Sequence, residues 1–220
     1  MKFLLTLLIS TQVNAATVLL IDTAPNAFHK DFKDQDITTF DYDGTGLPTS
    51  HENHGTGMLS LVINGRDGTS KLKKKHKYYV CSDFNNGNLK CYYLALSIKA
   101  DVINYSGGGE SAVAGEKEYI QKLSKAGVKM FFAAGNEGKN LEKTPYYPAS
   151  YAKAVSGIVA VQNVDDQGVT HESSNYASWT KKMPGVRIMT AYKNHTYGYF
   201  TGTSPATALA THEYLKGLEK

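Results

Sequence analysis

The chain has 220 residues, of which 41% are hydrophobic, so it is long enough to bury one core of ordinary size. Its 24 basic and 20 acidic residues give a formal charge of +4, which is too small to indicate a nucleic-acid partner. These bulk properties predict a single folded domain that does not bind nucleic acid, and we expect it to be a monomer.

The N-terminus has the residue order of a secretory signal. Lys2 precedes an apolar run at 3–9, and polar residues then lead to the small residues Ala15 and Ala16. The run is too short to span a bilayer, and no cysteine stands at the cleavage point to carry a lipid. We therefore expect a signal peptide at 1–15 and a secreted or periplasmic domain at 16–220 without a membrane anchor. A buried first helix is the alternative.

The only two cysteines are Cys81 and Cys91, which leaves one possible pairing. Cys81 falls on an expected strand and Cys91 on the helix that follows it. An oxidising compartment would permit a disulfide between them, but the sequence leaves open whether the two side chains meet.

Strand and helix patterns alternate along the chain. The apolar run at 17–21 predicts a parallel strand buried on both faces, and a helix is expected from His54 to the stop at 64–65. Further strands are predicted at 77–84, 101–106, 128–134 and 156–164, and further helices at 89–99, 115–127 and 204–220. This order predicts a doubly wound α/β fold with a mostly parallel sheet, right-handed crossovers and helices on both faces.

Polar residues follow the expected strands at the points where ligands bind in open α/β sheets. Asp22 ends the first strand, a Tyr-Ser-Gly-Gly-Gly segment at 105–109 ends another, and Asn136 follows a third. His54 and Ser204 each begin a helix, and helix N-termini in such folds face the same edge. We expect these side chains to lie together.

The clustered residue types match what amide hydrolysis requires. Ser204 offers a nucleophile, and its N–H in the first helical turn is free to stabilise an oxyanion. His54 offers a base, with Gly55 allowing another backbone to approach closely. Asp22 offers the carboxylate that orients the imidazole and balances its charge.

Several local strings resemble those of the subtilisin-like proteases. They are VLLIDT, HGTGM, AAGNEG and GTSPA, supported by YSGGG, YYPASY, SNYAS and PGVRI in the same order. The resemblance covers nearly all of the expected mature chain. It implies a serine endopeptidase acting on polypeptides, with Asp22, His54 and Ser204 as the catalytic triad and the Asn136 amide as an oxyanion donor.

The resemblance also implies where substrate binds. Ser106, Gly107 and Gly108 would pair with the substrate backbone as an added strand. Ala134 and Gly135 would line the pocket for the scissile residue.

The sequence departs from the family in three ways. Gly57 stands where the family usually has a second histidine, in the pattern H-G-T-H, which predicts looser helix packing near His54. Few residues separate the expected cleavage point from Asp22, so the folding-assisting prosegment usual in the family is not evident, and we expect folding or control to differ, for example through a separate inhibitor or folding partner. No carboxylate cluster indicates calcium, so no cofactor or metal is expected and a structural calcium is left open.

Simpler interpretations exist for each residue alone. Asp22 could be a strand-end cap, His54 a core histidine, Asn136 a turn residue and Ser204 a helix cap. His29 is expected to hold a surface turn, which is a structural role.

His51, which stands close to Glu52 and His54, lacks the helical spacing of zinc ligands.

Two rival functions are an inactive, peptide-binding relative of these proteases and a secreted esterase. No G-x-S-x-G elbow surrounds Ser204, which disfavours the esterase.

Overall fold

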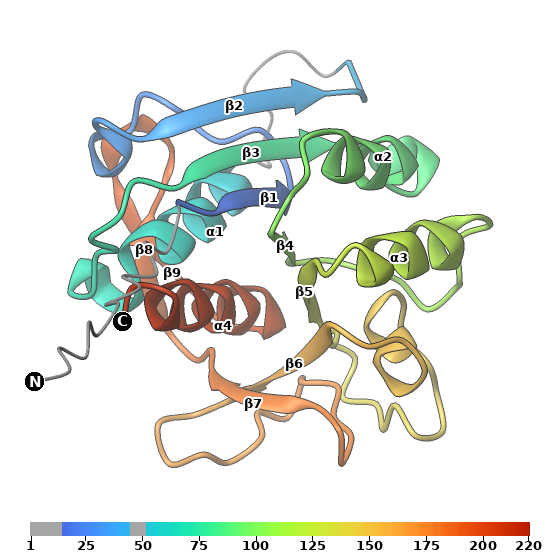
Figure 1. The fold of residues 1–220 in the computed structure, drawn as a ribbon. Helices are drawn as coiled ribbons and strands as arrows, with labels where there is room; N and C mark the ends of the chain where they lie inside the picture. The colour runs from blue at the N-terminus through green and yellow to red at the C-terminus, as the bar shows by residue number, and fades with distance from the viewer. Residues whose placement is uncertain (1–14, 45–51) are drawn as a thin grey trace, which may run out of the picture.

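A parallel sheet forms the centre of the molecule (Figure 1). The computed structural model describes residues 15–44 and 52–220. Within these residues seven strands hydrogen-bond in the order β2-β3-β1-β4-β5-β6-β7, and each neighbouring pair is parallel. The strands are β1 (Thr17–Ile21), β2 (Asp36–Asp41), β3 (Lys77–Ser82), β4 (Val102–Tyr105), β5 (Lys129–Ala133), β6 (Ile158–Val164) and β7 (Lys181–Pro184). An antiparallel hairpin of β8 (Ile188–Ala191) and β9 (Tyr197–Phe200) lies beside the sheet.

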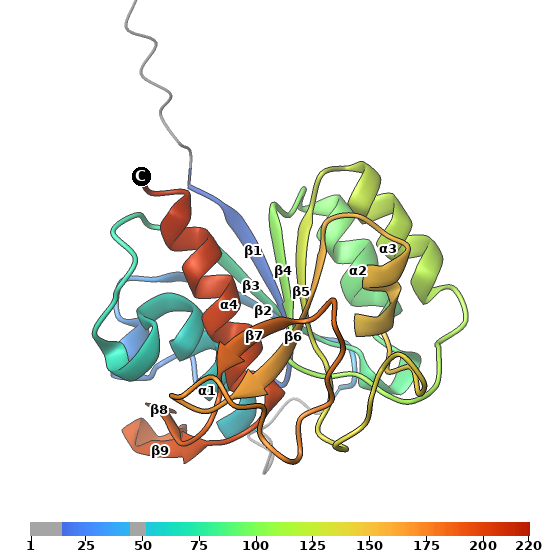
Figure 2. The same ribbon diagram turned by 90° about the horizontal axis from the view of Figure 1, so that it is seen from below.

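Helices cover both faces of the sheet (Figure 2). On one face α1 (Glu52–Asn64) packs against α4 (Thr203–Gly217), and on the other α2 (Leu89–Ser97) packs against α3 (Glu116–Lys125). Short 3-10 helices occupy Lys30–Phe32, Arg66–Gly68, Phe84–Asn86, Ala149–Lys153 and Lys193–His195. The arrangement confirms the predicted doubly wound α/β fold.

Strand β1 shows why the sheet needs helices on both sides. Val18 and Leu20 belong to the core shared with α1 and α4, whereas Leu19 and Ile21 belong to the core shared with α2 and α3. All four side chains are at most 1% exposed. Successive strand residues point to opposite faces, so a continuous apolar run is stable only when both faces are covered. Burial of each such side chain stabilises the fold by about 1.5–3 kcal/mol.

The strand order places a topological switch between β1 and β4. Strands β2 and β3 lie on one side of β1, and β4 to β7 continue outward on the other. The loops that leave β1 and β4 therefore diverge, and a crevice forms at their carboxyl ends. Asp22 follows β1 at this point, and Ser106 follows β4.

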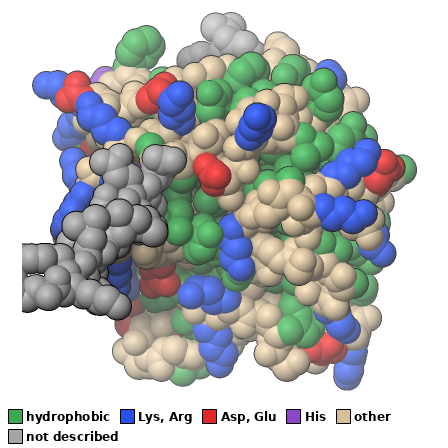
Figure 3. All heavy atoms as spheres, viewed as in Figure 1, with side chains coloured by type: hydrophobic (Ala, Val, Ile, Leu, Met, Phe, Trp, Pro, Cys, Tyr) green, Lys and Arg blue, Asp and Glu red, His purple; other side chains and the backbone are tan. Residues whose placement is uncertain are grey.

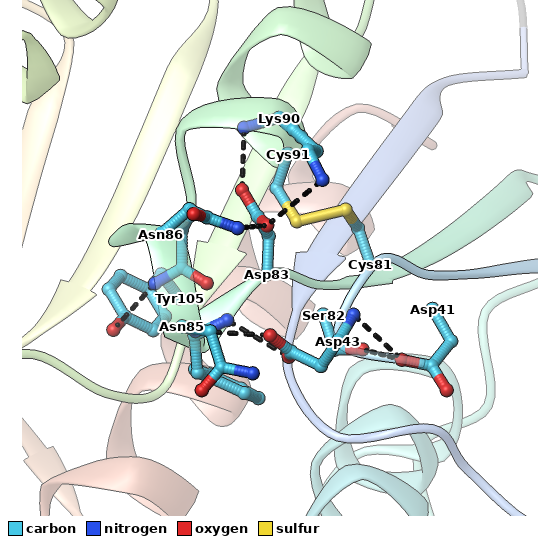
Figure 4. The surroundings of a disulfide bond; sticks show 12 residues. Asp41, Asp43, Cys81, Ser82, Asp83, Asn85, Asn86, Lys90, Cys91 and Tyr105 are labelled. Carbon is cyan, nitrogen blue, oxygen red and sulfur yellow. Dashed lines mark hydrogen bonds and ion pairs between the residues drawn. A yellow bond between two sulfur atoms is a disulfide. The ribbon is translucent and has the colours of Figure 1, made fainter. Parts of the chain in front are cut away.

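The cysteines form a disulfide, which settles the pairing that the sequence left open. Cys81 at the end of β3 is joined to Cys91 in α2, with their Cα atoms 5.7 Å apart. The bond closes the short connection that contains Asp83, as Figure 4 shows. This connection is therefore tied to the sheet at one end and to α2 at the other.

Charged side chains are distributed over the surface. On the face in Figure 3, basic and acidic side chains are interspersed rather than gathered by sign. The basic run at 71–77 keeps Lys71, Lys73 and Lys75 in solvent, while His76 is buried and accepts a hydrogen bond from the Ala16 N–H at 2.9 Å. Among the described residues, no helix is long and apolar enough to cross a membrane.

Candidate active site

The structure brings the predicted site residues to one edge of the sheet. Asp22 and Ser106 follow the neighbouring strands β1 and β4, and Asn136 follows β5 within the next few residues. His54 lies in the first turn of α1, and Ser204 in the first turn of α4. Both helices pack on the same face of the sheet, so their N-termini meet the carboxyl ends of the strands.

Asp22 and His54 form a close pair. The Nδ1 of His54 lies 2.8 Å from Oδ1 of Asp22, which is 3% exposed. The same carboxylate oxygen accepts a hydrogen bond from the N–H of Thr23 at 2.8 Å. With Nδ1–H donating to the carboxylate, the neutral imidazole presents Nε2 as its acceptor. This is the tautomer that a general base needs.

Two opposing influences set the pKa of His54. Burial lowers the pKa, but the Asp22 carboxylate, through its charge and its hydrogen bond, raises it by more. The net effect is a pKa above the ordinary histidine value. Asp22 therefore stabilises the imidazolium that forms when His54 accepts a proton.

Gly55 sets the distance between α1 and β1. Its N–H donates to Oγ1 of Thr23 at 3.0 Å, and a Cβ at this position would lie 1.9 Å from the Thr23 carbonyl oxygen. No such contact is tolerated, so only glycine allows the helix to approach the strand end this closely. The approach is what places His54 beside Asp22.

We expect Gly55→Ala to displace α1 and break the pair between His54 and Asp22. A shift of about 1 Å in a catalytic group can reduce turnover about a hundredfold, so we expect a loss of at least that size together with a lower melting temperature. Gly217→Ala is the matched control, because nothing lies within 4 Å of a Cβ there and α4 should gain helix propensity. Equal activity in Gly55→Ala and the parent would contradict this account of the helix position.

Ser204 is half-buried and directed toward the end of β4. Its Oγ donates to the carbonyl of Ser106 at 2.9 Å, and the Ser106 hydroxyl donates to the carbonyl of Ser204 at 3.1 Å. The amide of Asn104 donates to the same Ser106 hydroxyl at 3.0 Å. No hydrogen bond joins Ser204 to His54 in the described chain. The structure thus pairs two of the three predicted triad residues and leaves the serine hydroxyl bonded to Ser106.

Asn136 is positioned by the residue before Ser204. Its Oδ1 accepts hydrogen bonds from the N–H of Thr203 at 2.8 Å and from the Thr203 hydroxyl at 3.2 Å. This fixes the amide so that Nδ2 is left without a partner within the described residues. Gly202 packs against the same amide, since a Cβ there would lie 3.1 Å from Oδ1 of Asn136. An oriented, unused N–H donor beside the serine is what an oxyanion site requires.

The remaining predicted residues form two different kinds of surface. The main-chain groups of Gly107 and Gly108 make no hydrogen bond within the described chain, so they are open to an added strand. The Ala134 N–H donates to Val161, and the carbonyl of Gly135 accepts from Asn175 at 3.0 Å. Ala134 and Gly135 can therefore form a wall but have little main-chain capacity left for substrate.

Comparison with known proteins identifies the family. A sequence model of the family described as "Subtilase family" matches residues 14–215. The chain belongs to the subtilase family. The "Major intracellular serine protease" of Bacillus subtilis (strain 168) is 29% identical over 208 residues, covering 86% of this chain and 64% of that protein. "Subtilisin DY" of Bacillus licheniformis is 28% identical over 199 residues, covering 86% of this chain and 71% of that protein.

This subtilase matches only part of the length of each of its curated relatives. For "Subtilisin E" of Bacillus subtilis (strain 168), which is 26% identical over 200 residues, the match covers 86% of this chain and 52% of that protein. The chain thus spans between about half and about seven-tenths of the length of these relatives.

Solved structures agree with the fold. A mutant of the protease domain of PatA superimposes with a TM-score of 0.77 at 21% identity, covering 92% of this chain and 80% of that one. A cold-adapted subtilisin-like serine proteinase superimposes with a TM-score of 0.75 at 20% identity, covering 94% and 78%.

The expectation of loose packing around Gly57 is wrong. A Cβ at Gly57 would lie 2.7 Å from the ring of Phe200, so the glycine makes room for that ring. The Thr190 hydroxyl also donates to the Gly57 carbonyl at 2.8 Å, and the Phe200 ring lies edge-on to His54 at 5.9 Å. The hairpin of β8 and β9 therefore fills the space in this subtilase.

His29 has the structural role expected of it, although it is buried rather than on the surface. It is 1% exposed, and its Nδ1 accepts the Asp31 N–H at 3.2 Å, which caps a 3-10 helix. Burial lowers its pKa most strongly, and nearby Asp31 raises it in part. No group of three or more His, Cys, Asp or Glu side chains in the described ranges could hold a metal ion. His51 lies outside those ranges.

Proposed function

We propose that this subtilase is a serine endopeptidase in which Ser204 is the nucleophile, His54 the general base and Asp22 the residue that orients His54. The observation that carries the proposal is the 2.8 Å pair of Asp22 and His54 at the switch point of the sheet, beside the helix that begins at Ser204. The sequence similarity to serine proteases supports it.

The reaction would begin when the side chain of Ser204 rotates from Ser106 toward His54. Such a change between staggered rotamers involves one bond. Nε2 of His54 would take the hydroxyl proton while Oγ bonds to the carbonyl carbon of the substrate, and the carbonyl electrons would move to oxygen. Nδ2 of Asn136 and the N–H of Ser204 would hydrogen-bond to that oxyanion, because the first-turn N–H groups of a helix have no acceptor inside it.

The tetrahedral intermediate would then break its carbon–nitrogen bond. His54 would return its proton to the departing amine, which leaves Ser204 acylated. A water molecule would repeat the sequence: it loses a proton to His54, attacks the ester carbonyl and releases the acid, and Ser204 regains its proton. Throughout, the charge on His54 is balanced by Asp22.

We also propose that the protein acts after export. The expected leader at 1–15 lies almost wholly outside the described residues. The disulfide between Cys81 and Cys91 supports export, because such bonds persist in oxidising compartments.

Incubation of the purified chain with an unfolded protein and with a small peptide ester tests the proposed activity. Mass spectrometry of the products is expected to show cleavage at internal peptide bonds. Trimming from chain ends alone would contradict endopeptidase action. Hydrolysis of the ester alone would indicate an esterase, and binding of the unfolded protein by a folded chain without cleavage would indicate an inactive relative.

A further inference from the structure

A pocket of about 290 Å³ lies beside the open strand that ends in Gly108 and Gly109. One part of its lining comes from the connection between β3 and α2, through Phe84 and Asn88, and another part from Tyr147. Glu116, at the start of α3, also lines it. None of these residues belongs to the proposed catalytic group.

The pocket is placed so that a bound peptide would pass it. Gly109 exchanges two hydrogen bonds with Tyr147, at 2.8 and 2.7 Å, which closes the strand beyond Gly108. Gly107 and Gly108 remain open, and Ser106 contacts the nucleophile. A peptide paired along this segment would therefore run from Ser204 toward the pocket. At about 3.3 Å per residue, the side chain that enters the pocket lies about two to four residues from the scissile bond.

Two buried acceptor atoms on residues that line this pocket lack a well-formed hydrogen bond from any residue the structure describes. Glu116 is 3% exposed, and its Oε1 accepts the Tyr92 hydroxyl at 3.0 Å. The Tyr151 hydroxyl lies near enough to this carboxyl group to lower its pKa, but Oε2 has no hydrogen bond of good geometry with any described residue. Asn88 is also 3% exposed, and its Nδ2 donates to the Tyr105 hydroxyl at 3.0 Å, which leaves Oδ1 without a donor. Buried polar groups in proteins are almost always hydrogen-bonded, so two unsatisfied acceptors in one pocket indicate a missing donor.

The charge of the pocket indicates what kind of donor fits. Its lining holds a carboxyl group and no basic side chain. Burial raises the pKa of Glu116 to about 7, although the hydroxyl groups of Tyr92 and Tyr151 lower it in part. A positively charged donor would satisfy Oε2 and keep the carboxylate ionised. The rings of Phe84, Tyr105 and Tyr147 suit the apolar stem and the charged head of a long basic side chain.

The wall that carries Phe84 and Asn88 is held in place. The disulfide ties both ends of the connection, and Asp83 accepts hydrogen bonds from the Asn86 amide and the Lys90 N–H, both at 2.9 Å (Figure 4). Asp83 itself is fully buried. The pocket is therefore formed before any ligand arrives, which favours selectivity over adaptation.

We propose that this pocket binds a lysine or arginine side chain of the polypeptide substrate, located a few residues from the scissile bond, with Glu116 and Asn88 as its hydrogen-bond acceptors. The proposal rests on the proposed peptidase function. It assigns Glu116 as a residue that determines specificity and not one that takes part in bond cleavage.

The test compares peptides that differ at one position at a time, carrying arginine, lysine, norleucine or glutamate. For the purified parent we expect kcat/KM to be at least about tenfold higher for arginine or lysine than for norleucine at one position, because a buried charge without its partner is strongly disfavoured. Glu116→Gln should reduce that ratio about tenfold, and Glu116→Leu should favour norleucine. Glu118→Gln is the matched control on the same helix, since Glu118 is exposed and paired with Lys122, and it should leave the ratio unchanged.

A measurement of peptide binding tests this pocket separately from the proposed peptidase activity. Fluorescence anisotropy of the same labelled peptides with Ser204→Ala requires no turnover, so the ratio of affinities tests the pocket even if no peptide is cleaved or a Glu116 variant does not fold. Tighter binding of the basic peptides would support the proposal. Equal or tighter binding of norleucine, or a basic preference that survives in folded Glu116→Gln, would overturn it.

Discussion

Ser204→Ala is expected to remove nearly all peptide hydrolysis and leave the fold intact. In subtilisin, loss of the nucleophile lowers kcat by about 2 × 10⁶. A loss of similar order is expected here, because the neighbouring hydroxyl, that of Thr203, is buried and already donates to Oδ1 of Asn136. Stability should change little, since the side chain of Ser204 makes one hydrogen bond, to the Ser106 carbonyl.

Steady-state kinetics on a fluorogenic peptide, with thermal unfolding, measure both effects. Ser97→Ala is the matched control, because Ser97 is exposed near the end of α2, its hydroxyl bonds only to the Tyr93 carbonyl, and its loss should not affect kcat. Activity within about tenfold of the parent in folded Ser204→Ala would exclude Ser204 as the nucleophile.

Asp22→Asn is expected to reduce kcat by about 10⁴, the loss seen when a triad aspartate becomes an amide and the imidazole takes the wrong tautomer. The variant should also change the pH dependence. Turnover needs neutral His54, so parent activity should fall as the pH drops through its raised pKa. Without the Asp22 charge, burial alone remains and lowers that pKa. The acidic limb of kcat/KM should therefore move to lower pH.

A pH profile of kcat/KM for both proteins measures this shift. Asp166→Asn is a suitable control, because Asp166 pairs with Arg66 on the surface and is remote in sequence from the site. A limb that stays in place, or moves to higher pH, would show that Asp22 does not set the pKa of His54.

The central fold was predictable because its strands are buried on both faces. The run at 17–21 and the later apolar runs have no polar alternation, so they indicate a parallel sheet with two helical layers. Helix starts were less certain: α1 begins at Glu52, before His54, and α4 at Thr203. The N–H groups of the first helical turn have no partner inside the helix, so the sequence gives only a weak signal for the residue at which a helix begins.

The peripheral strands were missed for the opposite reason. Strand β2 is an edge strand whose side chains are all exposed or half-buried, and its first and last residues, Asp36 and Asp41, favour a loop. The hairpin strand β9 has exposed Tyr197 and Tyr199, which give no apolar signal. The β-branched run of Ile37, Thr38 and Thr39 in β2 and the alternating tyrosines in β9 were the available indications.

The site was predicted in its residue types, but its supporting contacts were not. Thr23 and Phe200 place His54 through contacts across the fold that no local pattern marks. The two acceptors on Asn88 and Glu116 likewise come together only because α2 packs against α3. Only the close approach at Gly55 had a sequence signal, because glycine beside a candidate base indicates a crowded backbone.

The most direct test of the catalytic assignment is covalent labelling by a fluorophosphonate, which reacts with an activated serine. The purified chain and Ser204→Ala would be treated in parallel, and the modified peptide identified by mass spectrometry. We expect one adduct, on Ser204, which is absent from the folded variant. An adduct on another residue would contradict the assignment of Ser204 as the nucleophile. So would the absence of any adduct after a well-folded parent protein is incubated with the probe at neutral pH.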